Sequence, residues 1–163
     1  MFVKKLEYAF ILLTITALIY LSKNYYDDYQ FKHNDIPQSY KNRISKKENE
    51  VLTLMQQHYG RAYKVPLIVT DKFKGRLYGL TVYKDGDVKI YLNKNVMQES
   101  IDYMVESVIA HEYAHALMFK LGDFSIKDEG HSKVWKDACI KLGGVGCAQY
   151  VNTNDVVMGK LPF

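Results

Sequence analysis

The residues best suited to chemistry in this sequence form the pattern HExxH, with His111, Glu112 and His115. In a helix, residues four apart lie one turn apart on the same face, so the two imidazoles can bind a single metal ion. Zinc at a catalytic site takes three protein ligands and leaves its fourth position to water. The pattern therefore predicts a zinc site that needs one further ligand.

The third ligand is expected to be His131, at the start of the final predicted helix. The intervening loop, residues 121–130, is long enough to turn back across the HExxH helix. His33 and His58 are poorer candidates, because the first lies in a polar spacer and the second lies near the end of another helix. The expected cofactor is one zinc ion held by the three histidines. Manganese, iron and cobalt stay open, because His-rich sites bind several divalent ions.

Glu112 is adjacent to a ligand but is rotated by about 100° around the helix, so it can face the zinc-bound water without binding the metal. Zinc lowers the pKa of bound water from about 15.7 to about 7, and a carboxylate can take its proton as the oxygen attacks a peptide carbonyl. HExxH also arises by chance on amphipathic helices. Here the helix is mostly apolar, where a glutamate and two histidines are costly to bury unpaired. We therefore expect Glu112 to be the catalytic base of a metallopeptidase.

Three helices are expected to position these residues. The first begins at a capping box made by Ser45 and Glu48 and stops at Gly60. The second, over residues 95–122, carries HExxH and is apolar on most sides, so it belongs in the middle of the domain. The third covers residues 132–142 and is expected to bury Val134, Trp135, Ala138 and Leu142.

Three strands are predicted by runs of β-branched and aromatic residues, at 65–70, 77–83 and 88–92. Between the last two lies Asp85-Gly86, a dipeptide that supplies the positive φ angles of a tight hairpin turn. The second and third strands should therefore be antiparallel neighbours. The expected fold class is α+β and zincin-like, with a small, mostly antiparallel three-stranded sheet packed on the central HExxH helix.

The N-terminal residues 1–23 are expected to form a single-pass membrane anchor. Lys4 and Lys5 precede an uncharged apolar stretch, Tyr8–Leu21, although this stretch is shorter than the ~20 residues that comfortably span a bilayer. A cleaved signal is a weaker alternative, because the residues before a cut after Ser22 include only one small residue at the required positions. A buried core helix is a third reading, disfavoured because the stretch is apolar on all sides. Residues 24–40 then read as a polar spacer, and residues 41–163 as the domain.

Composition limits the remaining classes. The 163 residues suit one globular domain, with 48% apolar and 25% charged residues, and the net charge of +4 does not argue for nucleic acid. Short basic clusters are expected to be solvated surface rather than a phosphate-binding face; they comprise Lys41, Arg43, Lys46 and Lys47, and Lys72, Lys74 and Arg76. Two cysteines, Cys139 and Cys147, exclude a four-cysteine zinc ribbon. They are expected to be free and buried, although pairing outside the cytosol stays open.

From Lys64 to Gly144 the sequence resembles the SprT-like metallopeptidase domain, the family that includes the Spartan proteases acting on DNA–protein crosslinks. The resemblance lies in the strand ending IYLN, in HEYAHALMF, in the segment DEGH that ends with His131, and in Trp135 followed by LGG. It implies zinc ligands at His111, His115 and His131 and a catalytic Glu112. Two features depart from the family: the C-terminal zinc ribbon is missing, and an anchor is unexpected because members are usually soluble and intracellular.

The function expected is a zinc-dependent metalloendopeptidase that hydrolyses peptide bonds of a protein substrate lying extended along the sheet edge. The alternative from another class is a noncatalytic zinc-stabilised protein-binding module. A DNA-associated protease or DNA-binding protein has weaker support. The few charges around the apolar stretch favour, only weakly, a domain outside the cytosol, where an envelope or extracellular protein would be the substrate. A cytosolic domain would leave DNA-associated or membrane-proximal substrates open.

Overall fold

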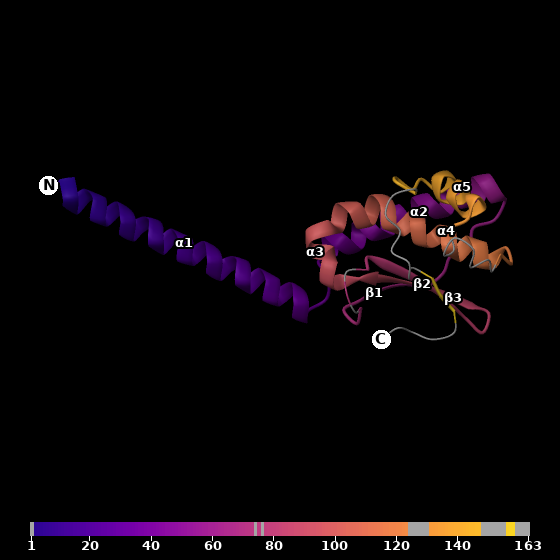
Figure 1. Ribbon diagram of the computed structural model, residues 1–163, viewed down its shortest axis with the longest axis horizontal. Coiled ribbons are helices and arrows are strands. Elements are labelled where there is room, and N and C mark those ends of the chain that lie inside the picture. The colour runs from indigo at the N-terminus through magenta and orange to yellow at the C-terminus, as the bar shows by residue number, and fades with distance from the viewer. Residues whose placement is uncertain (1, 74, 76, 124–130, 148–155, 159–163) are drawn as a thin grey trace. The chain divides into compact units, whose positions relative to one another are not determined.

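The structure is a computed structural model (Figure 1) that describes residues 2–73, 75, 77–123, 131–147 and 156–158. It divides into two compact units, Met1–Ile36 and Pro37–Phe163. The first unit holds one helix, and the second holds the remaining helices and the sheet. In chain order the elements are α1 (Phe2–His33), α2 (Gln38–Tyr59), β1 (Leu67–Thr70), β2 (Gly79–Lys84), β3 (Asp87–Asn93), α3 (Lys94–Tyr103), η1 (Met104–Val108), α4 (Ile109–Lys120), α5 (Lys133–Lys141) and β4 (Val156–Met158).

Helix α1 continues well past the apolar stretch, through residues that the sequence assigned to a polar spacer. Near its end Lys32 forms an i,i+4 ion pair with Asp28 at 2.8 Å, and the rings of Tyr29 and His33 stack with centroids 4.1 Å apart. Pairs with this spacing lie on one helix face and support the helix locally. Residues 24–33 of the expected spacer are therefore helical.

The expected membrane anchor is also wrong: in the described part of the chain, no helix is both long and apolar enough to cross a membrane. The uncharged stretch Tyr8–Leu21 makes about 21 Å of helix, whereas the hydrocarbon core of a bilayer is about 30 Å thick. Charged residues lie on both sides of it, with Glu7 directly before and Lys23 two residues after. The expected membrane localisation depended on this anchor and is therefore corrected with it.

Helix α2 begins earlier than the sequence predicted. It starts at Gln38, directly after Pro37, rather than at the expected capping box of Ser45 and Glu48. Proline suits this place because its fixed φ fits a helix start and the first amides of a helix have no partner within it. The other end is confirmed: Gly60 has φ 71° and its N–H donates to the carbonyl of Gln56.

The sheet has the strand order β1-β3-β2-β4. The predicted hairpin of β2 and β3 is confirmed, with positive φ at both Asp85 (53°) and Gly86 (89°). The other two pairings are parallel, with Leu67 opposite Ile90 in β1 and β3, and with β4 alongside β2. The α+β class is thus confirmed, but the sheet is mixed and four-stranded rather than mostly antiparallel and three-stranded. Residue patterns reveal which segments are strands but not the direction of pairing between segments distant in sequence.

The single long helix expected over residues 95–122 is three segments: α3, the π-helical turn η1, and α4. Its first cap is Asn93 rather than Asn95, because the side-chain oxygen of Asn93 accepts the N–H of Asn95 at 2.9 Å. Ser100 leaves helical geometry with φ −137°. The end of the helix is as predicted, with Gly122 at φ 80°. A π-helical turn often occurs at functional sites, and here it directly precedes the HExxH helix.

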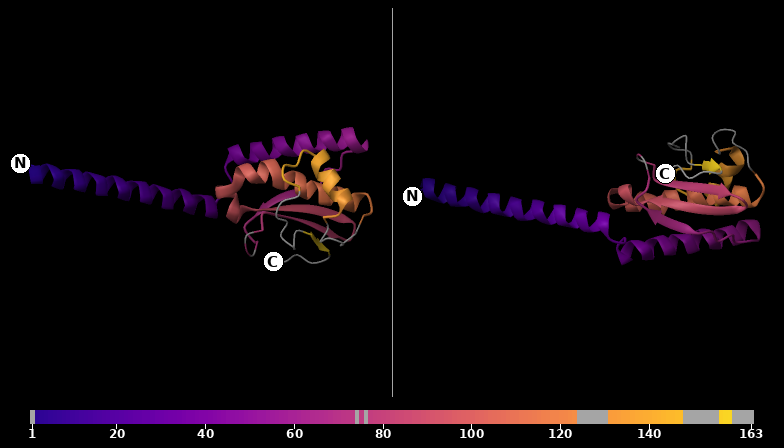
Figure 2. Two further views of the ribbon diagram at one scale, coloured as in Figure 1. Left: turned by 45° about the horizontal axis from the view of Figure 1, so that its top comes forward. Right: turned by 90° about the horizontal axis from the view of Figure 1, so that it is seen from below.

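Helix α4 lies in the centre of the second unit, between α2 and the sheet (Figure 2), and it also contacts α5. All its residues from Ile109 to Phe119 are buried except His111. The predicted central position of the HExxH helix is therefore confirmed. Helix α5 buries Trp135, Ala138 and the following Leu142 as expected, but Val134 is 60% exposed because it points away from this face.

Candidate metal centre

The Nε2 atoms of three histidine side chains lie close together. His111 and His115 come from successive turns of α4, and His131 lies just before Ser132, the residue that caps α5. The Nε2 atoms are 3.2 Å apart for His111 and His115, 3.1 Å for His115 and His131, and 3.3 Å for His111 and His131. Nitrogen ligands placed tetrahedrally at 2.0–2.1 Å from zinc lie about 3.3 Å from one another. The three histidines can therefore hold a metal ion of this size, as the sequence predicted.

Burial sets the protonation state of His115. This side chain is only 2% exposed, whereas His111 and His131 are partly exposed. Burial lowers the pKa of His115 well below its ordinary value, and the charges on His111 and His131 lower it further. A neutral imidazole is the form that binds a metal ion. The site thus favours the neutral form of His115, which can bind a metal ion.

Trp135 packs against all three histidines. Its ring stacks on His115 with centroids 4.9 Å apart and 24° between the planes, and it meets His131 edge-on at 4.4 Å and His111 at 4.7 Å. Only 1% of Trp135 is exposed. Sequence reasoning placed this residue in the core but missed its contact with the imidazoles; the available signal was its spacing, one helical turn after His131.

Glu112 points to the sheet rather than to solvent, with 1% of its surface exposed. The hydroxyl of Thr81, on β2, donates to Oε2 of Glu112 over 2.6 Å and lies 3.0 Å from its main-chain oxygen. Thr81 is itself fully buried. Sequence reasoning missed Thr81, although a polar residue on the covered face of a strand is a usable signal because buried hydroxyls need partners.

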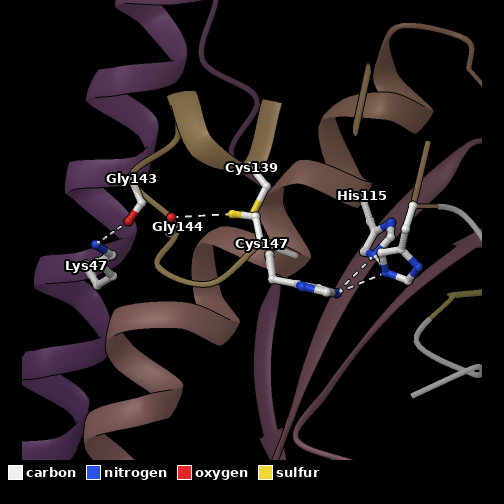
Figure 3. Close-up of a disulfide and its surroundings, with 8 residues drawn as sticks. Lys47, His115, Cys139, Gly143, Gly144 and Cys147 are labelled. Carbon is white, nitrogen blue, oxygen red and sulfur yellow. Dashed lines mark hydrogen bonds between the residues drawn. A yellow bond between two sulfur atoms is a disulfide. The ribbon is translucent and has the colours of Figure 1, made fainter. Parts of the chain in front are cut away.

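Cys139 on α5 and Cys147 after this helix form a disulfide with Cα atoms 6.0 Å apart (Figure 3). The expectation of two free buried cysteines is therefore wrong. The turn that follows α5 brings them together: Gly143 has φ 77°, and a Cβ on Gly144 would lie 2.6 Å from each sulfur. Glycine at both positions lets the chain fold back on itself.

Lys47 contacts the same turn, because its Nζ donates to the carbonyl of Gly143 over 3.2 Å. Lys47 is only 5% exposed, which corrects the expectation that all members of its basic cluster are solvated.

The profile of the SprT-like family matches residues 38–155, well over half of the chain. The chain belongs to the SprT-like family. The resemblance noted from Lys64 to Gly144 is confirmed, and the SprT-like match extends beyond it at both ends.

Among curated proteins, the chain is similar to Protein SprT of Vibrio atlanticus (strain LGP32), with 28% identity over 103 residues. This aligned part covers 63% of the present chain and 58% of that SprT protein. The chain thus spans a little over half the length of the curated relative that it matches. No solved structure matches the chain.

Some residues of the SprT-like motifs lie in the described part of the chain, and others lie outside it. The structure brings His111, His115, His131 and Trp135 together and places Glu112 one position along α4. The acidic residues directly before His131, Asp128 and Glu129, lie outside the described residues. His33 and His58 do not join the histidine cluster. The chain thus combines membership of the SprT-like family with three clustered histidines that could bind a metal ion.

Proposed function

We propose that this SprT-like chain is a zinc-dependent metalloendopeptidase that hydrolyses peptide bonds of a protein substrate. The observation that carries the proposal is the triangle of Nε2 atoms, 3.1–3.3 Å on each side, with a buried carboxylate on the residue next to His111. His111, His115 and His131 would hold the zinc ion. Zinc, when bound, acidifies water and polarises a carbonyl oxygen.

Glu112 supplies the acid–base part of the reaction. Its carboxylate accepts a proton from the attacking water as the new carbon–oxygen bond forms at the substrate carbonyl. It then gives this proton to the amide nitrogen as the carbon–nitrogen bond breaks, so that the products are a carboxylic acid and an amine. The hydrogen bond from Thr81 keeps the carboxylate in one place for both proton transfers. Burial strengthens these interactions, because the surroundings screen charge less than water does.

A protein substrate fits this site as an extended segment paired with a strand, since main-chain hydrogen bonds place a peptide carbonyl without demanding a sequence. Specificity should then be loose. Among the described strands, β2 contacts Glu112 through Thr81, and it is paired with β3 on one side and with Val156–Met158 of β4 on the other. A substrate strand that paired with β2 itself would have to displace one of these two neighbours.

The test is metal content and casein cleavage by the full chain, as wild type and as Glu112→Gln. One zinc per chain in both proteins, with cleavage by the wild type alone, is the expected result. Glutamine keeps the shape of the side chain but cannot accept the proton, so zinc binding should persist while turnover is lost. Zinc in both proteins without cleavage by either would instead favour the noncatalytic zinc-stabilised binding module. Absence of zinc from the wild type would overturn the proposal at its first step.

A further inference from the structure

Strand β2 contacts both oxygens of the Glu112 carboxylate. Thr81 donates its hydroxyl to Oε2 over 2.6 Å. Gly79 lies against the other oxygen, because a Cβ on Gly79 would be 2.7 Å from Oε1 and 2.9 Å from Cγ of Glu112. Residues two apart in a strand face the same side, so Gly79 and Thr81 form one continuous surface under this side chain.

The two contacts restrict Glu112 in different ways. A hydroxyl-to-carboxylate hydrogen bond of 2.5–2.7 Å belongs to the strong, charge-assisted class, and the observed 2.6 Å falls within it. Threonine is branched at Cβ and has few allowed rotamers, so its hydroxyl is a fixed anchor for the long glutamate side chain. A Cβ at position 79 would crowd Oε1 of Glu112 at 2.7 Å and also Cγ1 of Val108 at 2.8 Å. Thr81 and Gly79 thus border the carboxylate on the side of the sheet.

We propose that Thr81 and Gly79 are positioning residues for Glu112, with Thr81 holding Oε2 and Gly79 leaving room for Oε1. The inference rests on the proposed role of Glu112 as the base of a peptidase. It adds that β2, and not only the HExxH helix, carries part of the catalytic apparatus. Loss of the Thr81 hydroxyl should then slow the reaction without removing zinc.

The decisive pair of variants is Thr81→Val and Thr81→Ser in the full chain. Valine has the shape of threonine without its hydroxyl, whereas serine keeps the hydroxyl and loses only a methyl group. We expect Thr81→Val to lower kcat for casein peptides by roughly 10- to 100-fold, the usual cost of removing a partner that orients a functional group at a metal site. KM and zinc content should not change. Thr81→Ser should keep kcat within about threefold of the wild type.

The comparison of Thr81→Val with Thr81→Ser separates loss of the hydroxyl from loss of packing. An unchanged kcat in Thr81→Val would overturn the role of Thr81, as would an equal loss in Thr81→Ser. Gly79→Ala should likewise lower kcat while zinc is retained, and full activity in this variant would remove Gly79 from the proposal.

A measurement that does not depend on catalysis tests this inference separately from the proposed function. The side-chain carboxyl carbon of Glu112, assigned by its disappearance in Glu112→Gln, should shift in the ¹³C spectrum of Thr81→Val and stay in place in Thr81→Ser. If the wild type cleaves no peptide, the proposed function fails, while this spectrum still decides whether Thr81 holds Glu112. An identical resonance in the wild type and in Thr81→Val would contradict the inference even in an active enzyme.

Discussion

On one side of the metal centre, α4 presents His111 and His115 from a helix that is buried against β2, β3 and α2. On the other side, His131 precedes α5, a helix of nine residues held by its Ser132 cap, the Cys139–Cys147 disulfide and the Lys47 contact to the following turn. The first side is fixed by the packing of the core alone. The second also buries Trp135, Ala138 and Leu142, but its cap and its following turn depend on these separate links, so single changes among them should loosen the site without unfolding the domain.

The largest effect is expected from removing a ligand on the α5 side. His131→Ala should lower zinc affinity by roughly a hundredfold or more, because about 10–16 kcal/mol of zinc binding is shared among a few ligands. His131 is partly exposed, so the metal-free fold should keep its melting temperature. Competition with a chromophoric chelator measures the affinity, and circular dichroism measures the melting.

The matched change on the α4 side is His115→Ala. It should also lose zinc, but it should lower the melting temperature of the metal-free protein too, because His115 is 2% exposed and stacks on Trp135. Equal melting temperatures for the two metal-free variants would contradict the contrast between the two sides.

Removing the disulfide should have the next largest effect. The bridged cysteines are 8 residues apart. Chain-entropy arguments give a stabilisation of about 2.6 kcal/mol for closing a loop of this length. Urea unfolding of Cys139→Ser/Cys147→Ser should show that loss, and the wild type in a reducing agent should match the double variant. An unchanged unfolding midpoint would mean that the turn after α5 is held without the bond.

Lys47→Met should cost about 2 kcal/mol of unfolding free energy, the typical value for a hydrogen bond from a charged group. The change leaves the carbonyl of Gly143 without the donor that now lies 3.2 Å away, and it also removes the ion pair of Lys47 with Glu50 at 3.0 Å. Lys46→Met is the matched control, because Lys46 is an exposed neighbour on the same helix. Equal urea midpoints for the two variants would show that Lys47 does not stabilise the turn.

The smallest effect is a dependence of metal-free stability on pH. Burial and the charges on His111 and His131 lower the pKa of His115 in the folded state, so the unfolded chain binds a proton that the folded chain excludes. Stability should be complete above the ordinary pKa of 6.5 and fall as pH decreases below it, by at most about 1.4 kcal/mol per pH unit. Melting in a chelator from pH 7.5 to 5.5 measures this. His115→Gln should flatten the dependence, and an equally steep fall in this variant would assign it to other groups.

Local chemistry in the sequence determined several parts of this protein. The four-residue spacing of His111 and His115 places both on one helix face whatever the rest of the chain does. Asp85-Gly86 defines the hairpin, and Gly60 and Gly122 end their helices, because few other residues adopt positive φ at low cost. The α+β class followed from these local signals, as did the nomination of His131 as the third ligand.

Contacts between distant segments were decided only by the tertiary structure. The parallel pairing of β1 with β3, the contact of Thr81 with Glu112, and the Cys139–Cys147 bond each join positions whose distance depends on how the whole unit packs. Sequence patterns carry periodicity along one element, but they do not carry the register between elements. For this reason the clustering of the three histidines could be predicted from the sequence. The packing of the Trp135 ring against them and the contact of β2 with the Glu112 carboxylate could not.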